Sequence, residues 1–182
     1  MSAPLIEPMT HTAQFAEGES RPAGSETVAA ILKRCKISLI ADWLVRTKGT
    51  PALNELNLSD KRRTGHLPQL VDDIVARLAE STMPTKDSDS PASAAARKHG
   101  DLRQMQGYSA TMLIHESRIL QVTIFGTLQK NLSLLDIKLL LPDVMTIADE
   151  VDSQLTQTME SFTNATAKAA KGRLVKPTVS HR

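Results

Sequence analysis

The sequence contains very few aromatic residues. Tyr, Phe and Trp together make up 3% of the 182 residues, whereas 41% of the residues are hydrophobic. Because strand-forming aromatic residues are scarce, a β-sandwich or β-barrel fits this composition poorly. The core must consist mainly of Leu, Ile, Val, Met and Ala, which pack well between helices. The composition therefore favours an all-α fold.

Several other features are also missing. The only cysteine, Cys35, excludes an internal disulfide framework and fits a reducing compartment. Residues 1–20 lack the basic start and apolar run of a signal peptide. The most apolar internal stretch, 119–128, is too short to cross a bilayer. We therefore expect a cytoplasmic protein without membrane insertion.

Hydrophobic periodicity and capping residues divide the chain into three parts. Residues 1–24, rich in Pro, Gly, Ser and Thr, are expected to be a disordered leader. Residues 25–165 are predicted to form a single helical bundle with about five main helices, for which a globin-like arrangement is one option. Residues 166–182 are expected to be a basic flexible tail.

The expected helices begin at polar or proline residues. Ser25, Ser59 and Ser109 are predicted N-caps, and Pro68 suits the first turn of a helix. Residues 81–91 are predicted to form a loop. Pro142 is expected to kink the last helix or to mark a new start near Leu141.

The last helix has a continuous apolar seam. From Ile137 to Ala169, small or apolar residues recur at alternating spacings of four and three. This spacing keeps one side of a helix facing a partner helix. We interpret it as a dimerising or signal-transmitting helix, with an ordinary bundle helix as the alternative. The seam residues named for this role are Val144, Ala148, Val151, Leu155 and Phe162.

The sequence shows no pattern of a known catalytic or cofactor site. His115-Glu116 begins like a zinc-protease helix, but Ile119 occupies the position of the second ligand. Phosphate-binding loops and nucleophile elbows are missing. We therefore expect no enzymatic activity, no catalytic residues, no metal and no cofactor.

The sequence gives weaker support to two other ligand classes, haem and nucleic acid. A haem pocket would need a proximal histidine such as His66 or His99, but the few Phe residues offer little to line a porphyrin. The tail carries basic residues that attract nucleic acid without specificity. It lacks aromatic residues for stacking, so no specific nucleic-acid partner is expected. These basic residues are Lys168, Lys171, Arg173, Lys176 and Arg182.

The most distinctive stretch is His99–Glu116. On a helix, His99, Arg103 and Gln106 share one face. Gly107 then ends that helix, and Glu116 lies about two turns into the next. Charged and aromatic groups meeting at such a corner form a buried polar network or read a ligand or pH. The residues predicted for this site are His99, Arg103, Gln106, Gly107, Tyr108 and Glu116.

This stretch resembles the N-terminal domain family of RsbRD-type RsbT co-antagonists, also found at the front of bacterial sensor kinases. The hallmark HG-x-x-R-x-x-QGY-x-x-x-x-L-x-x-E is matched by His99, Gly100, Arg103, Gln106, Gly107, Tyr108, Leu113 and Glu116. Trp43, Leu58-Ser59 and His66-Leu67-Pro68 extend the similarity, which covers about residues 28–162.

The resemblance implies an all-helical sensory or regulatory domain of bacterial stress-response or sensor-kinase signalling. Domains of this family are often dimeric and usually precede an output domain. The expected partners are therefore a second copy of the chain and a signalling protein such as a kinase or a STAS-domain protein. The alternative function is a small-ligand or haem-binding sensor.

Overall fold

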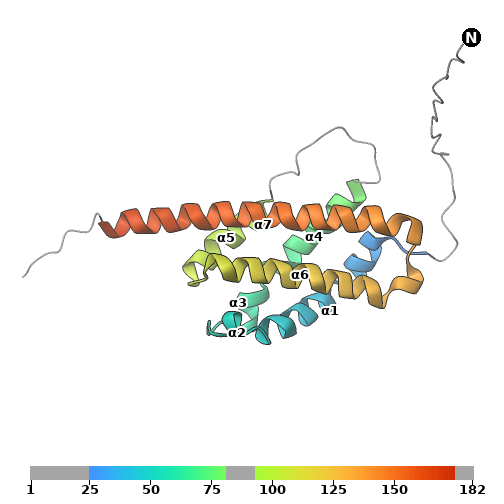
Figure 1. Cartoon of the computed structure of the whole chain (residues 1–182), viewed down its shortest axis with the longest axis horizontal. Coiled ribbons are helices and arrows are strands. Elements are labelled where there is room, and N and C mark those ends of the chain that lie inside the picture. Colours follow the sequence, from blue (N-terminus) through green and yellow to red (C-terminus); the bar gives the residue numbers. More distant parts are fainter. Residues whose placement is uncertain (1–24, 81–92, 175–182) are drawn as a thin grey trace, which may run out of the picture.

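The computed structural model describes residues 25–80 and 93–174, which form a bundle of helices (Figure 1). The elements are α1 (Val28–Lys48), α2 (Pro51–Asn54), α3 (Asp60–Thr64), α4 (Leu67–Glu80), α5 (Ala94–Met105), α6 (Ala110–Lys130), the 3₁₀ turn η1 (Leu132–Leu134) and α7 (Ile137–Leu174). The all-α prediction and the long C-terminal helix are confirmed. The predicted leader (1–24) and loop (81–91) lie outside the described residues.

Serine side chains cap several helices. Ser59, Ser93 and Ser109 each accept a hydrogen bond from the backbone N–H three residues later, as N-caps do. The expected caps at Ser59 and Ser109 are therefore present. Pro68 lies in the first turn of α4, also as expected.

The predicted cap of the first helix was wrong. Thr27 Oγ1, not Ser25, accepts the N–H of Ala30 at 2.9 Å. The reason lies in the tertiary structure, because the N–H of Glu26 donates to the carbonyl of Leu134 at 2.7 Å. This pairing with the end of η1 keeps the chain extended just before α1.

Helix α7 is less interrupted than the sequence suggested. It continues through Pro142, so the alternative of a new start near Leu141 is wrong. A proline so close to the start of the helix removes only one helical hydrogen bond. The helix also runs to Leu174, past the predicted domain end at 165. The strong helix formers between 165 and 173, mostly Ala and Lys, favour this extension over a flexible tail.

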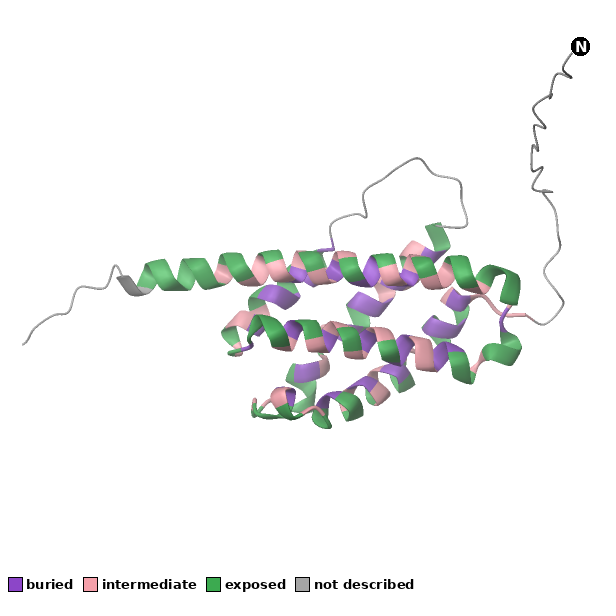
Figure 2. Cartoon of the chain, in the orientation of Figure 1, coloured by how far each residue is buried: buried purple, intermediate pink, exposed green. Residues whose placement is uncertain are grey.

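The main core lies between α1, α4, α6 and the first half of α7. Its fully buried side chains include Ile31, Leu39, Trp43, Ile74 and Ile124. Figure 2 shows buried residues on the inward faces of these helices and exposed residues along the last turns of α7. No helix in the described part of the chain combines the length and apolarity required to cross a membrane.

Helix α5 lies against the middle of α7 with little space between their backbones. A Cβ atom on Gly100 would stand 2.2 Å from the carbonyl oxygen of Thr158 and 2.9 Å from the backbone nitrogen of Phe162. Thr158 Oγ1 also donates to the carbonyl of Ala96 at 3.1 Å. Gly100 therefore sets the distance between α5 and α7.

Candidate functional site

A group of polar side chains, buried except for the half-buried His66, lies where α5, α6 and the start of α4 meet. It comprises His66, His99, Arg103, Tyr108 and Glu116, hereafter the polar cluster. Arg103 is 1% exposed and Glu116 is 3% exposed. His99 and Arg103 come from α5, Glu116 from α6, Tyr108 from the turn between them, and His66 from the residue before α4. Charged groups are rarely buried so completely unless they are paired.

Arg103 and Glu116 form a two-fold ion pair at the centre of the polar cluster. Arg103 Nε donates to Glu116 Oε2 at 3.0 Å, and Nη2 donates to Oε1 at 2.8 Å. This fork geometry is the strongest arrangement for an arginine and a carboxylate. The pair joins α5 to α6.

The remaining N–H groups of Arg103 donate to backbone carbonyls of α3 and to the side chain of Gln106. Nη2 donates to the carbonyl of Arg63 at 2.8 Å, and Nη1 donates to the carbonyl of Arg62 and to Gln106 Oε1. A guanidinium has five N–H donors, and all five are therefore used. Arg103 fixes α3 and the end of α5 relative to each other.

Glu116 remains ionised because its carboxylate is well supplied with donors. Tyr108 donates its hydroxyl to Oε1 at 2.7 Å, and the Arg103 guanidinium lies 4.5 Å above the Tyr108 ring. Burial acts to raise the pKa of Glu116, but the hydrogen bond from His99 and the charge of Arg103 outweigh it, so the pKa lies below its ordinary value. Burial and the neighbouring carboxylate raise the pKa of Tyr108.

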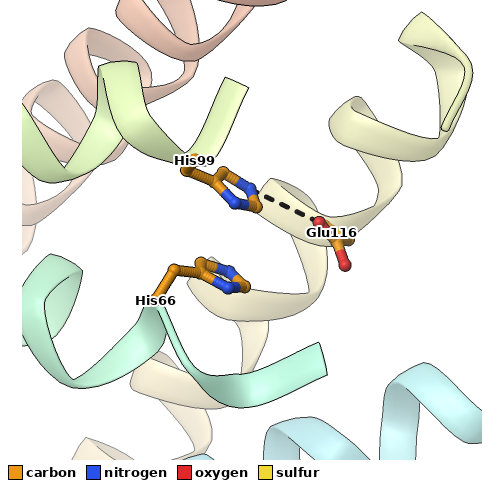
Figure 3. Close-up of side chains that lie close together, drawn as sticks. All are labelled: His66, His99 and Glu116. Atoms are coloured by element: carbon orange, nitrogen blue, oxygen red, sulfur yellow. Dashed lines mark ion pairs between the residues drawn. The ribbon is translucent and has the colours of Figure 1, made fainter. Parts of the chain in front are cut away.

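The two histidines are stacked beside this ion pair. Their ring centroids are 3.8 Å apart with an interplanar angle of 13°, and Trp43 makes an edge contact with His66 at 6.0 Å. Figure 3 shows both rings on the same side of Glu116, one from α5 and one from the start of α4.

Both histidines are neutral near pH 7. Burial lowers the pKa of His66 well below 6.5, and the nearby His99 and Arg103 lower it further. Burial also lowers the pKa of His99, although Glu116 partly offsets this effect. Within the described residues, His99 Nδ1 is buried without a hydrogen-bond partner. The histidines therefore offer uncharged nitrogen atoms to a ligand.

A cleft of about 860 Å³ opens next to the polar cluster. Its volume falls within the range of typical small-molecule sites. Its walls come from α3, α4 and α5, and His66, His99 and Arg103 lie along it. Further lining residues include Lys61, Arg62, Gln69, Lys98 and Leu102. The cleft connects the polar cluster with solvent.

The predicted corner residues do come together. Gly107 has a φ of +81°, and the N–H groups of Gly107 and Tyr108 donate to the carbonyls of Gln104 and Arg103, respectively. This is a glycine-terminated helix end of the Schellman type. It turns Tyr108 back over Arg103, so that its hydroxyl reaches Glu116.

His66 is the site residue whose position the sequence reasoning missed. His66 and His99 are 33 positions apart in the sequence, and helical spacing says nothing about such distant pairs. The available signal was its place in the His66-Leu67-Pro68 segment of the family resemblance. One donor atom each from His66, His99 and Glu116 lie within 4.8 Å of one another.

The predicted seam of α7 faces mostly its own bundle. Val151 is 3% exposed, Val144 packs against the main core, and Phe162 packs near Tyr108 and Leu113. Ala148 and Leu155 are half-buried. Packing within one chain therefore accounts for much of the seam, and Leu155 also lines a surface pocket with Ile114 and Met159.

The fold and the site together define an all-α bundle that encloses a hydrogen-bonded charge cluster beside an open cleft. Searches against protein-family models, curated proteins and solved structures find no match to this chain. The family resemblance and the globin-like arrangement therefore stay predictions from the sequence.

Proposed function

We propose that this chain is a non-catalytic sensory or regulatory module of bacterial signalling. The polar cluster and its cleft form the input, and α7 forms the output. The observation that carries the proposal is that α5 belongs to both regions. It supplies His99 and Arg103 to the polar cluster, and it contacts α7 through Gly100.

The input side is sensitive to charge because its ion pair is buried. Arg103 connects Glu116 on α6 with the carbonyls of Arg62 and Arg63. A ligand or proton that alters the charge of this cluster changes interactions on three elements at once. Such a change favours a new position of α5, since buried charges tolerate little loss of pairing.

The contact between α5 and α7 can transmit that change. Gly100 lies directly against the α7 backbone, and Ser161 Oγ donates to Asp101 Oδ1 at 2.7 Å. Closely packed elements shift together because the interface has no free volume to absorb a displacement. Movement of α5 therefore acts on the middle of α7.

The end of α7 is available to a partner. The side chains of residues 166–172 are exposed, and the helix extends past the rest of the bundle (Figure 1). Next to it, Leu155 and Met159 form an apolar strip with Ile114, which is 51% exposed. We propose a homodimer that buries this strip, with a kinase or STAS-domain protein as the downstream partner.

Hydrogen exchange tests the transmission from the polar cluster to α7. Glu116→Gln keeps the shape of the side chain and removes its charge. We expect faster exchange in α7 peptides that cover residues 150–165, although the Glu116 side chain is bonded to Arg103 and Tyr108 and not to that part of α7. The control is Ile31→Val in α1, compared at equal global stability by adding urea. Equal exchange in α7 for both proteins would refute the transmission.

Light scattering tests the dimer. We expect a mass of about twice the 19.8 kDa chain mass, and Leu155→Asp should reduce it to one chain because it places a charge in the apolar strip. Met145→Asp, at a 66% exposed position of the same helix outside the strip, is the control. A wild-type protein that stays monomeric at all concentrations would overturn the dimer.

A further inference from the structure

We propose that the cleft beside the polar cluster binds a small organic anion, with a doubly charged head group such as a phosphate ester and an apolar body. This inference names the ligand class of the input site, and it rests on the proposed function for taking the cleft as that input. The features that carry it are uncompensated positive charge at one end of the cleft and an apolar wall beside that charge.

Three cationic side chains that line the cleft have no acidic partner within the described residues. Lys61 and Arg62 lie on α3, and Lys98 lies on α5. None of the three takes part in an ion pair in the described part of the chain. All three are exposed, so each can turn toward a ligand without losing such a pair. Arginine and lysine are the usual side chains for the recognition of phosphate groups.

The acidic side chains of the cleft already have partners. Asp73 Oδ2 accepts a hydrogen bond from Ser93 at 2.7 Å, and Glu80 lies 4.0 Å from Arg77. Glu150 Oε1 accepts a hydrogen bond from its own helix at 2.9 Å. Asp73 lies about two turns into α4, away from the α3 end of the cleft. The uncompensated charge of the cleft is therefore positive and lies at the end formed by α3 and the polar cluster.

Arg103 holds this end of the cleft in place. Its Nη1 donates to the carbonyl of Arg62 at 3.2 Å, and its Nη2 donates to the carbonyl of Arg63 at 2.8 Å. Arg103 is itself unavailable to a ligand, because Glu116 and these carbonyls use its donors. Arg62 contacts Arg103 through its backbone, which leaves its guanidinium for the cleft. A bound anion therefore meets cations on a backbone that is already positioned, which lowers the cost of binding.

The apolar wall of the cleft accounts for the organic body of the ligand. Leu102, Ala95 and Ala76 line the cleft together with the cations. Leu102 is half-buried and lies four residues after Lys98 on α5, a spacing that places both side chains on one face of the helix. An inorganic ion would leave this surface in water, whereas an attached apolar group covers it and gains affinity from its burial. The volume of about 860 Å³ leaves room for such a group.

Phenyl phosphate, inorganic phosphate and phenol test the two halves of the ligand separately. Each is titrated into the isotope-labelled full chain, and the shifts of backbone amide signals in NMR spectra give the dissociation constant. We expect phenyl phosphate to bind saturably, with a dissociation constant of roughly a few millimolar for a molecule of its size, and to shift signals of α3 and α5. Inorganic phosphate and phenol should each bind at least about fivefold more weakly, because each lacks one half of the ligand.

Variants that remove one charge locate the anion. Arg62→Gln and Lys98→Gln should each weaken the binding of phenyl phosphate by about two- to fivefold, which is the effect of an exposed ion pair. The double variant should weaken it by roughly tenfold. Arg97→Gln is the matched control, because Arg97 is the exposed neighbour of Lys98 on α5 and does not line the cleft. Leu102→Ala should weaken the binding of phenyl phosphate and leave that of inorganic phosphate unchanged.

The absence of saturable phenyl phosphate binding would overturn the proposal. So would equal binding by wild type and Arg62→Gln/Lys98→Gln, or an equal loss in Arg97→Gln. Binding of phenol or of inorganic phosphate as tight as that of phenyl phosphate would also overturn it. The exchange comparison for Glu116→Gln is made without ligand and tests the signalling proposal separately. Faster α7 exchange without anion binding would refute only the ligand class, and anion binding with unchanged exchange would refute only the transmission.

Discussion

The main core and the ion pair at the centre of the polar cluster are both buried, but they are stabilised in different ways. Trp43 is 0% exposed in the core and Arg103 is 1% exposed in the cluster. Core side chains gain stability from area removed from water, which needs no particular partner. Arg103 and Glu116 depend on specific donors and acceptors, and the loss of one leaves the other unpaired. The core should therefore tolerate change better than the cluster.

Trp43 connects the two regions. Trp43 belongs to the main core, makes an edge contact with His66, and directs its indole N–H toward the carbonyl of Glu116 at 3.4 Å. The rigid core thus supports one wall of the polar cluster. This arrangement favours an accurately positioned site, since neighbouring groups that are locked by packing hold functional side chains in place.

The largest predicted effect comes from removing Arg103. Arg103→Ala should lower the free energy of unfolding by about 3–5 kcal/mol, because it leaves a buried carboxylate without its partner. Urea denaturation measures this loss. The double variant Arg103→Met/Glu116→Leu should recover most of it, since apolar side chains then replace both members of the buried ion pair.

The core provides the comparison for that experiment. Leu39→Ala should lower the free energy of unfolding by about 2–5 kcal/mol, because it creates a cavity in the core. Adding Glu116→Leu to this variant should not restore the lost stability. If the double variant is no more stable than Arg103→Ala, the cluster does not depend on charge pairing in the way we describe.

The contact between α5 and α7 should show an intermediate effect. Gly100→Ala should destabilise the protein by about 1–3 kcal/mol, because the added methyl group overlaps the α7 backbone. Gly126→Ala is the matched control, since the nearest atom to its new Cβ is Arg46 Nη2 at 3.9 Å. The free energy of unfolding of Gly126→Ala should rise by up to about 1 kcal/mol, because alanine has a higher helix propensity than glycine. Equal melting temperatures for the two variants would contradict the close approach.

The smallest predicted effect is a dependence of stability on pH. The pKa values of His66 and His99 are lowered on folding, so the unfolded chain binds more protons as the pH falls below about 6.5. Stability should therefore be constant above this pH and decrease below it. The lowered pKa of Glu116 acts in the same direction at more acidic pH.

Urea midpoints between pH 7.5 and 5.5 measure this decrease. His66→Gln should make the dependence on pH shallower, and His115→Gln should leave it unchanged. Increasing stability on acidification would show that the histidines are protonated in the folded protein.

Much of the fold was predictable because it depends on local interactions. The serine caps at Ser59 and Ser109 and the glycine that ends α5 act within a few residues of their partners. The same is true of the corner from His99 to Glu116, where two consecutive helices and a short turn hold the residues. The cap at Ser25 was wrong because the distant Leu134 decides the backbone conformation there.

Local patterns of residues specify the helices, most of their ends, and the members of the polar cluster that lie close together along the chain. Periodicity and capping express interactions over three or four residues, and these can be read from one sequence. The packing of separate helices is what stacks His66 on His99, places Gly100 against α7, and turns much of the α7 seam toward its own bundle. These contacts depend on how separate helices pack, and no local pattern of residues encodes that arrangement.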